Sequence, residues 1–599
     1  MCGICGELRF DGKGADLAAV DRMTGRLQSR GPDHGGSYSD GALGFGHRRL
    51  SIIDLSEKSN QPLVDQELGL VLVFNGTIYN YRELRRELQQ RGYHFFSDGD
   101  SEVILKAYRE WGQDCPRHLH GMFAFAVWDM RDRSLFLARD RFGIKPCYWS
   151  RDERRFRFAS SLPALLAGGD VDTSLDATAL HFQFTLHGVV PAPRTVLNGV
   201  RKLKPATWMK LGADGREAQG RYWTLDATRP DRPLSEEEWV EATHERLRAA
   251  VAKRNDIADV PVGVLLSGGL DSSLLVALLA ELGRSDLHTY SIGFEDQPEE
   301  SGNEFEYSDQ VVERYRPHHH KMLVPNDQVL ARLPEAVDAM AEPMFGQDAV
   351  AFYLLSEQVS QSIKVVQSGQ GADEVFGGYF WFQKIMEDDQ GDCADRLRRY
   401  YFDREHEEYL NMVQASYQVP DVTGDYIRER LNQSGAEECI DAVLRLDATT
   451  LIVDDPVKRV DNMTMAWGLE ARVPFLDHEL VELAARCPPD IKFRSGGKHL
   501  LKRVARGIVP DAVIDRPKGY FPMPALKYVR GEFLDFMRDI VNSQACRERG
   551  LYQRKYLDRL LSAPEMHHTR IQGSKLWQLA LLEFWLQRHV DGAQAGIPD

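Results

Sequence analysis

The sequence lacks any run of 18 apolar residues, and its first ten residues, MCGICGELRF, contain neither a basic segment nor an apolar one. A helix that spans a membrane needs about 20 mostly apolar residues, and a secretory leader needs both kinds of segment. We therefore expect a cytoplasmic protein without a membrane partner.

An excess of positive charge is also absent. The 599 residues include 74 Lys and Arg against 90 Asp and Glu, which gives a net charge of −16. Nucleic-acid binding depends on cations that neutralise phosphates, so this balance argues against nucleic acid as a partner. A small anionic ligand is still compatible, because one local cluster or a helix N-terminus can bind it.

Cysteines are few, and the eight present form no dense framework of the kind that stabilises small secreted domains. We expect all of them to be reduced: Cys2, Cys5, Cys115, Cys147, Cys393, Cys439, Cys487 and Cys546. The Cys2–Cys5 spacing fits a metal or redox pair, but no second pair completes a zinc site. The adjacent histidines at 318–320 would point to opposite faces of a strand, so we expect no zinc site there either.

The first part of the chain predicts a domain built on antiparallel strands. Short runs with strand composition or alternation occur at 41–55, 68–81, 123–130 and 134–142, and glycine or Asp-Gly punctuation separates them. Helical patterns interrupt at 82–92, where Gly92 is a plausible C-cap, and at 101–112. We predict an α+β domain over residues 2–215.

The pattern changes after a proline-rich segment. We predict a linker at 216–235 that ends in a helix N-cap at Ser235. Beyond it, the apolar strands 260–267, 287–294, 322–325 and 364–369 alternate with helices at 236–254, 271–283 and 306–315. Continuous apolar strands that alternate with helices are typical of a parallel sheet covered on both faces. We predict an α/β domain over 236–590 that becomes mostly helical after residue 380.

Cys2 directly follows the initiator methionine. Removal of Met1 would give Cys2 a free α-amine with an ordinary pKa of about 8, close to the thiol value of about 8.5. The amine could then accept the thiol proton, as in an N-terminal nucleophile. A cysteine at this position, taken alone, is more often a chance occurrence.

The neighbouring motifs favour the functional interpretation. They are MCGICG at 1–6, RGPD at 30–33, HRRLSIID at 47–54, FNGTIYN at 74–80 and GDSEVI at 99–104. With these motifs the chain resembles the class II glutamine amidotransferases, specifically the asparagine synthetase B type. The resemblance implies an Ntn-hydrolase domain with an antiparallel sheet sandwich, followed by an ATP-pyrophosphatase domain.

The same resemblance assigns roles around Cys2. Arg49 would bind the α-carboxylate of glutamine, Asp100 its α-amino group, and Asn75 with the Gly76 amide would form the oxyanion hole. These residue types suit the chemistry, because a guanidinium matches a carboxylate and two neutral donors can stabilise an oxyanion. One position departs from the family pattern: Thr77 stands where Glu is usual, and we expect that one glutamine contact is lost.

A second set of motifs lies in the α/β domain. SGGLDSS at 267–273 follows an apolar strand and opens a helix. Glycines let the backbone approach phosphate closely, and hydroxyls, N–H groups and the helix N-terminus can then bind the anion. SGQGADEVFGGY at 368–379 follows the strand at 364–367.

These segments resemble the pyrophosphate loop and the SGEGSDE–FGGY segment of the same family. The resemblance implies a site that binds ATP and Mg²⁺. Ser267, Gly268, Gly269, Asp271, Ser272 and Ser273 would bind the phosphates, Leu265, Ile292, Ser368 and Gly369 would frame the adenosine, and Asp271 and Asp373 would hold Mg²⁺.

Lys498 occupies the position of the family's lysine over the reacting acyl phosphate, where a cation would stabilise developing charge. Without the family, an exposed helical lysine would be the simpler interpretation, and Lys502 is the alternative candidate. Within the family-like segment 460–482, we expect Arg472 and Asp477 to be structural rather than catalytic.

The acceptor carboxylate is the open question. Thr77, Ala341 and Gln370 depart from asparagine synthetases, and Gln370 could not act as a general base where Glu is usual. The segments 187–206 and 516–527 resemble the N-acetylglutaminylglutamine amidotransferase subgroup, so we expect that acetylated dipeptide as the acceptor. The alternatives are an asparagine synthetase acting on aspartate, a non-catalytic amino-acid sensor, and a cyclising enzyme like β-lactam synthetase, which commonly lacks the N-terminal cysteine. The sequence does not decide between a monomer and a homodimer.

Overall fold

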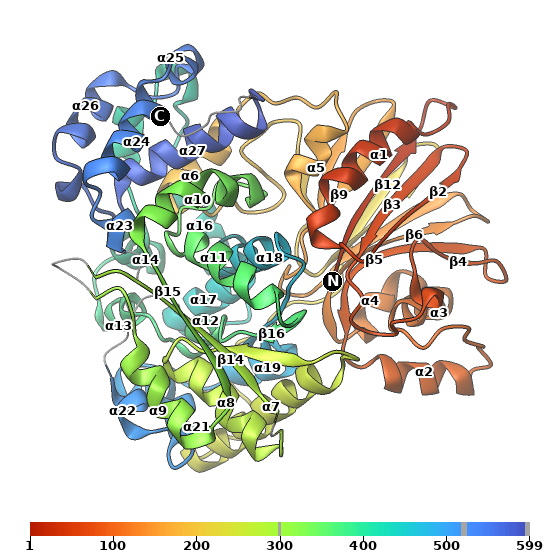
Figure 1. Ribbon diagram of the computed structural model, residues 1–599, viewed down its shortest axis with the longest axis horizontal. Coiled ribbons are helices and arrows are strands. Elements are labelled where there is room, and N and C mark those ends of the chain that lie inside the picture. Colours follow the sequence, from red (N-terminus) through yellow and green to blue (C-terminus); the bar gives the residue numbers. More distant parts are fainter. Residues whose placement is uncertain (285, 297–300, 517–523, 593–599) are drawn as a thin grey trace.

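Three sheets organise the chain. The computed structural model describes residues 1–284, 286–296, 301–516 and 524–592. Within these residues, two six-stranded antiparallel sheets form the N-terminal domain, and a five-stranded parallel sheet lies in the second domain (Figure 1). The antiparallel sheets have the orders β10-β8-β9-β1-β3-β2 and β12-β11-β7-β6-β5-β4. Their strands are β1 (Cys2–Arg9), β2 (His34–Asp40), β3 (Leu43–Arg49), β4 (Leu63–Asp65), β5 (Leu70–Ile78), β6 (Gly121–Asp129), β7 (Ser134–Arg139), β8 (Tyr148–Arg151), β9 (Arg155–Ala159), β10 (Arg201–Lys202), β11 (Thr207–Gly212) and β12 (Glu217–Arg221).

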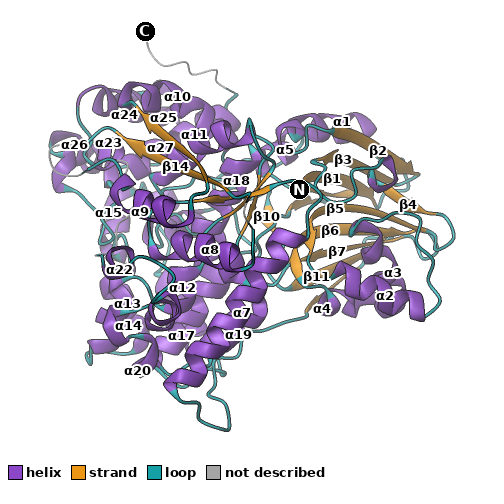
Figure 2. Ribbon diagram, turned by 60° about the horizontal axis from the view of Figure 1, so that its bottom comes forward, coloured by secondary structure: helices purple, strands orange, loops and turns teal. Residues whose placement is uncertain are grey.

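The two antiparallel sheets pack face to face. Ile4, Phe45, Val73, Trp128 and Phe158 are each 1% exposed or less and belong to one apolar cluster between the sheets. Helices α1 (Leu17–Arg26) and α5 (Leu162–Ala167) contact the first sheet, and α3 (Ser101–Trp111) contacts the second beside α2 (Tyr81–Gln90), as Figure 2 shows. The predicted antiparallel α+β domain of Ntn-hydrolase type is confirmed.

Helix α2 matches the predicted helix 82–92 closely. Tyr81, Leu84 and Leu88 are buried at intervals of three to four residues, so one face packs on the domain core. Gly92 follows the helix with φ +94°, a left-handed conformation that glycine adopts without strain. Two short helices, α4 (Cys115–His118) and α6 (Ala177–Thr185), complete this half of the chain.

The parallel sheet of the second domain has the order β15-β14-β13-β16-β17. Its strands are β13 (Val262–Leu265), β14 (His288–Phe294), β15 (His318–Val324), β16 (Val365–Gln367) and β17 (Glu470–Arg472). All neighbouring pairs are parallel, so the predicted α/β architecture is confirmed. Ser235 accepts from the Glu238 N–H and Glu238 accepts from the Ser235 N–H, a capping box that begins α7 (Glu236–Asp256).

Helices cover both faces of this sheet and make up the C-terminal part. Those in the first half of the domain are α8 (Leu270–Glu281), α9 (Phe305–Tyr315), α10 (Asn326–Ala339), α11 (Asp348–Ser360), α12 (Ala372–Phe376), α13 (Phe380–Glu387), α14 (Cys393–Tyr401), α15 (His406–Met412), α16 (Val422–Leu431), α17 (Cys439–Leu446) and α18 (Lys458–Met465). The remainder are α19 (His478–Ala485), α20 (Pro489–Lys492), α21 (His499–Ala505), α22 (Asp511–Asp515), α23 (Pro524–Lys527), α24 (Gly531–Asn542), α25 (Gln544–Arg549), α26 (Arg554–Ser562) and α27 (Lys575–His589). None of the helices within the described ranges has the length and apolar character needed to cross a membrane.

Two expectations need correction. The segment predicted as a linker, 216–235, contains β12, which pairs with β11 at the edge of the second antiparallel sheet. The sequence of this strand, EAQGR, is polar and exposed, so it has no apolar pattern that would predict a strand. The strand is stabilised by backbone hydrogen bonds to β11 rather than by buried side chains.

The second correction concerns the cysteines. Cys393 and Cys439 form a disulfide, whereas we expected every cysteine to be reduced. Their sequence separation of 46 residues gave no hint of proximity, and the pair meets only because α14 and α17 pack against each other. The other six cysteines are free and buried.

The N-terminus lies where the two domains meet (Figure 1). Met1 is 2% exposed, and its ammonium group forms an ion pair with Glu470 at the start of β17. The motif 516–527, used above to choose the acceptor, lies largely outside the described residues.

Candidate active sites

Cys2 begins β1 in the centre of the first sheet, paired with Arg49 of β3. Its backbone N–H donates to Oδ1 of Asn75 on β5 at 3.0 Å. The Asn75 side chain is fully buried, and within the described chain its Nδ2 atom has no hydrogen-bond partner. Buried polar groups are almost always hydrogen-bonded, so this unused donor beside the cysteine is suited to a substrate oxygen.

The residue after Asn75 has to be glycine. A Cβ atom at Gly76 would lie 2.2 Å from the carbonyl oxygen of Met122 on the neighbouring strand β6. The strands therefore approach too closely for any side chain, and the Asn-Gly pair predicted as the oxyanion hole lies beside the nucleophile in a rigid ladder.

Arg49 and Asp100 lie in the same pocket, as the motifs predict. A cavity of about 30 Å³ is lined by both of them together with Cys2, Gly76 and Thr77. The Arg49 Nη1 atom donates to the Ser56 carbonyl at 2.8 Å and to Asn60 Oδ1 at 2.7 Å, and Nη2 donates to loop carbonyls. These bonds hold the guanidinium rigidly, and a carboxylate could use the terminal nitrogens only by displacing some of them.

Burial dominates the protonation equilibria of this pocket. It raises the pKa of the Cys2 thiol, although the N-terminal ammonium and Arg49 oppose the shift. It also raises the pKa of Asp100 to about 6, against the N–H group of Ile78 that donates to this carboxylate at 3.0 Å. The thiol would therefore need a base or a nearby cation to ionise near neutral pH, whereas the carboxyl of Asp100 loses its proton as the pH rises through about 6.

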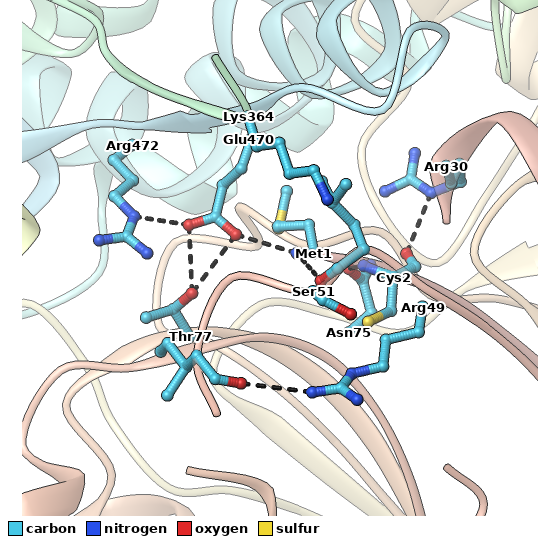
Figure 3. Close-up of polar contacts among 12 residues, drawn as sticks. Met1, Cys2, Arg30, Arg49, Ser51, Asn75, Thr77, Lys364, Glu470 and Arg472 are labelled. Carbon is cyan, nitrogen blue, oxygen red and sulfur yellow. Dashed lines mark hydrogen bonds and ion pairs between the residues drawn. The ribbon is translucent and has the colours of Figure 1, made fainter. Parts of the chain in front are cut away.

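Sequence reasoning missed one residue of this pocket, Glu470. It comes from β17 of the second domain, yet its carboxylate lines the pocket beside Cys2 (Figure 3). The Met1 ammonium lies 3.1 Å from Glu470 Oε2, the Thr77 hydroxyl donates to Oε1 at 3.2 Å, and Arg472 Nε donates to Oε1 at 2.5 Å. Arg472 thus holds the carboxylate of Glu470, which belongs to the same motif and reaches the other domain.

A second link between the domains also ends at Cys2. Arg30 Nε donates to the Cys2 carbonyl at 3.3 Å, and Arg30 Nη1 contacts Asp461 of α18 at 2.9 Å. Asp461 also accepts from Lys145 at 3.0 Å. The cysteine and the residue before it are therefore both tied to the second domain.

The SGGLDSS loop opens α8 at the end of β13 and borders a cavity of about 480 Å³. Of the residues predicted to bind ATP, the cavity lining includes Leu265, Ser267, Gly269, Asp271, Ser272, Ile292, Ser368 and Gly369. Gly268 and Ser273 are not part of it. The Ser273 side chain is fully buried within α8, and the Gly268 carbonyl accepts from Arg516 at 3.3 Å.

The loop is already folded in a shape that suits phosphate. Gly268 has φ +80°, and a Cβ atom there would lie 2.8 Å from the Ser308 nitrogen, so both conformation and space require glycine. Ser267 N–H donates to the Ser272 hydroxyl at 3.2 Å, which closes the loop over the helix N-terminus.

Lys498 lies between the two aspartates predicted to hold Mg²⁺. Its Nζ atom is 2.6 Å from Asp271 and 2.8 Å from Asp373. Burial alone would lower the pKa of Lys498, but the two carboxylates raise it instead. Mg²⁺ prefers carboxylate oxygens together with oxygens from the phosphates of a bound nucleotide. Asp271 and Asp373 face the same space beside the phosphate loop, so these residues fit the ion. Lys502, the alternative, donates to the Ser495 carbonyl at 2.6 Å.

A second cavity adjoins the first. It has a volume of about 190 Å³ and shares Asp348, Tyr379 and Arg459 with the larger one. Its other lining residues include the aromatic side chains Phe345, Phe380, Trp381 and Tyr401 and part of a π-helical stretch, Asp447–Leu451. π-helical segments occur frequently at functional sites.

Comparisons with known proteins agree with this arrangement. Residues 1–223 match the glutamine amidotransferase domain family, and residues 242–587 match the asparagine synthase family. Asparagine synthetase [glutamine-hydrolyzing] 3 of Bacillus subtilis is 32% identical over 94% of this chain and 93% of its own length. A putative asparagine synthetase [glutamine-hydrolyzing] of Mycobacterium tuberculosis is 34% identical, over 89% of this chain and 88% of its own.

A more distant relative has a different name. The amidase chyE of Penicillium rubens is 27% identical over 88% of this chain and 89% of its own length. The fold, the two sites and these similarities together define a class II glutamine amidotransferase. The chain belongs to the asparagine synthase family, in its glutamine-hydrolysing, two-domain form.

Proposed function

We propose that this chain hydrolyses glutamine at Cys2 and uses the ammonia to amidate a carboxylate that ATP has activated, with release of AMP and pyrophosphate. We further propose that the acceptor is N-acetylglutaminylglutamine rather than aspartate. The first statement rests on the geometry around Cys2 and on family membership, and the second on the aromatic cavity beside the ATP site.

In the glutaminase half, removal of Met1 would leave the Cys2 α-amine next to its own thiol, where it can act as the base. The thiolate would attack the side-chain amide of glutamine. Nδ2 of Asn75, which is otherwise unused, and the Gly76 N–H would stabilise the oxyanion. Asp100 would bind the α-ammonium of the substrate, and the positive charge of Arg49 its α-carboxylate.

In the synthetase half, the SGGLDSS loop would hold the pyrophosphate part of ATP while the acceptor carboxylate attacks the α-phosphate. Mg²⁺, held by Asp271 and Asp373, would neutralise charge on the phosphates. Lys498, which lies 2.6 and 2.8 Å from these aspartates, would stabilise the negative charge that builds up in the transition state. Ammonia would then displace AMP from the acyl-adenylate.

Ammonia should pass between the sites inside the protein, since free solution would dilute and protonate it. Buried ionic contacts cross the domain interface, in support of this idea. Lys202 of the N-terminal domain contacts Glu342 of the second at 3.1 Å, and Lys458 contacts the same carboxylate at 3.2 Å. The Tyr148 hydroxyl donates to Glu342 at 3.2 Å, and all four side chains are at most 5% exposed.

The aromatic cavity is the observation that carries the choice of acceptor. Aspartate is small and carries two carboxylates, whereas the cavity offers about 190 Å³ and several aromatic walls. Tyr379 and Trp381 are stacked, with ring centroids 4.2 Å apart. Such walls suit the methylene and amide groups of an acetylated dipeptide with one carboxylate, and they leave much of the space around aspartate unfilled.

An acceptor screen tests the proposal. Purified protein with glutamine, ATP and Mg²⁺ should release pyrophosphate with N-acetylglutaminylglutamine and little with aspartate. The same dipeptide with its C-terminus already amidated is the matched control and should give no pyrophosphate, because it has no carboxylate to activate. Equal or faster turnover with aspartate would overturn the choice of acceptor.

The asparagine synthetase alternative has one specific support, the names of the relatives from Bacillus subtilis and Mycobacterium tuberculosis. The Trp381→Ala variant separates it from our proposal. We expect this change to raise the KM for the dipeptide by about 2- to 13-fold, as an aromatic contact is worth about 0.5–1.5 kcal/mol, and to leave the weak reaction with aspartate unchanged. Failure of every acceptor to give pyrophosphate would favour a non-catalytic sensor.

A further inference from the structure

The N-terminal amine of this chain faces a carboxylate from the other domain. In the structure the Met1 ammonium lies 3.1 Å from Glu470 Oε2 and 3.4 Å from the Leu50 carbonyl. The ammonium and the Glu470 side chain are both fully buried. Charge pairs with no solvent screening interact strongly, so the ammonium and the carboxylate attract each other across the domain interface.

Glu470 is held as an anion. Burial alone would raise the pKa of this carboxyl, but Arg472, the N-terminal ammonium and Lys145 together lower it to about 2. Arg472 is itself fixed, because its Nη1 atom donates to the carbonyls of Arg254 and Ile257, each at 2.8 Å. The negative charge is therefore permanent at any pH where the enzyme would work.

Removal of Met1 moves the amine by one residue only. The nitrogen atoms of consecutive residues are about 3–4 Å apart, so the free Cys2 amine would lie no more than about 7 Å from the Glu470 carboxylate. It keeps the hydrogen bond to Asn75 Oδ1, 3.0 Å in the structure. The space left by Met1 is bordered by the Glu470 carboxylate, the Leu50 carbonyl and the Thr77 hydroxyl, polar groups that a bridging water could use.

We propose that Glu470 is a positioning residue of the glutaminase site: it supplies, from the synthetase domain, the counter-charge that orients the Cys2 amine and sets its proton affinity. This inference rests on the glutaminase half of the proposed function and is independent of the acceptor. Thr77 takes part by donating its hydroxyl to Glu470 at 3.2 Å, whereas a glutamate at 77 would place a second negative charge against it.

Other charged groups also face this position, and one of them, Asp100, itself responds to Glu470, whose charge helps to raise the pKa of Asp100. They are Arg49 of β3, Asp100 at the start of α3, Arg30, Lys145, Arg472 of β17 and Asp461 of α18. Both pairs of variants described below are therefore also measured in Asp100→Asn protein, where the limb reports the effect of the changed charge on the amine.

The pH dependence of kcat/KM for glutamine, measured without acceptor on protein whose Met1 removal is checked by mass spectrometry, tests the inference. The base must be neutral to accept the thiol proton, so its pKa defines the acid limb. In Glu470→Gln the amine loses a nearby anion and becomes easier to deprotonate, which should move the acid limb to lower pH by about one unit. Thr77→Val keeps the charge and should leave the limb in place.

A second pair of variants gives the opposite sign without touching Glu470. Thr77→Asp adds an anion and should move the acid limb to higher pH, while Thr77→Asn, of the same size, should not. This pair decides the matter if Glu470→Gln fails to fold. Superimposable profiles for the parent and Glu470→Gln, or for Thr77→Asp and Thr77→Asn, would overturn the inference. A parent enzyme with no glutaminase activity at any pH would instead overturn the proposed function.

Discussion

The two candidate sites differ in free volume and in the exposure of their side chains, and we call the smaller, more buried one the closed site and the larger one the open site. The pocket at Cys2 has about 30 Å³ of free space, and Cys2, Asn75 and Asp100 are at most 7% exposed. The ATP-site cavity and the aromatic cavity beside it offer about 480 and 190 Å³, and the Asp271 and Asp373 carboxylates in the first of these are 18% exposed. In the proposed function the small pocket would receive the side-chain amide of glutamine, and the larger cavities would receive ATP and the acceptor.

The difference also concerns where the site residues come from. Lys498 and the two aspartates of the open site all belong to the synthetase domain. The closed site is completed by Glu470 and braced by Asp461, both from the other domain. The glutaminase half is therefore expected to depend on domain docking more than the synthetase half does.

Replacement of the proposed nucleophile, Cys2, should have the largest effect on activity. It should abolish the reaction at the closed site and leave the reaction at the open site intact. We expect Cys2→Ala to lower glutamine-dependent amide synthesis at least about 10³-fold, because no other cysteine among the described residues lines this pocket. With ammonium chloride in place of glutamine, synthesis should stay within about twofold of the parent, since the open site is intact. Loss of the ammonia-dependent reaction as well would contradict the separation of the sites.

A change at the open site should have the reverse pattern. Lys498→Met should lower acceptor-dependent pyrophosphate release by about 10²- to 10³-fold, as removal of a group that stabilises transition-state charge does elsewhere. Glutaminase activity without acceptor should be unchanged. Lys502→Met is the matched control, and because Lys502 donates to the Ser495 carbonyl we expect a change within about threefold. A larger loss at Lys502 than at Lys498 would reverse the assignment.

Contiguous motifs account for most of what could be predicted. Each half of the fold has its own periodicity, and the strands and helices found at β3, β5, α2 and α7 follow the apolar patterns closely. The pockets likewise bring together residues that short motifs had already grouped, such as Arg49 with Asp100 and Asp271 with Asp373. A short motif predicts its own local conformation, and the order of the motifs along the chain indicates which of them form one site.

Contacts between distant segments could not be predicted. Glu470 reaches the Cys2 pocket because β17 lies at the edge of its sheet, next to the other domain. No sequence pattern in residues 460–482 predicts this position. The Cys393–Cys439 disulfide depends in the same way on the packing of α14 against α17. β12 was missed because an exposed edge strand needs no apolar alternation.

The smallest expected effect is a pH dependence that belongs to the closed site alone. Burial, with a contribution from Glu470, raises the pKa of Asp100 to about 6. Ionised Asp100 would bind the α-ammonium of glutamine, so as pH falls below about 6 the carboxyl becomes protonated and this attraction is lost. The KM for glutamine should then rise up to about tenfold per pH unit, while the KM for ATP stays level.

Stability should change in the opposite direction. Because the pKa of Asp100 in the folded protein lies above its ordinary value of about 3.9, the native state binds this proton more tightly than the unfolded chain. Its contribution to stability is therefore full at low pH and is lost as pH rises through about 6. Asp100→Asn should gain in Tm relative to the parent between pH 5 and pH 8, while its KM for glutamine becomes high at every pH. A KM for the parent that is flat between pH 5 and 8 would mean that Asp100 does not bind the ammonium, and the closed site would then have to recognise glutamine through another group.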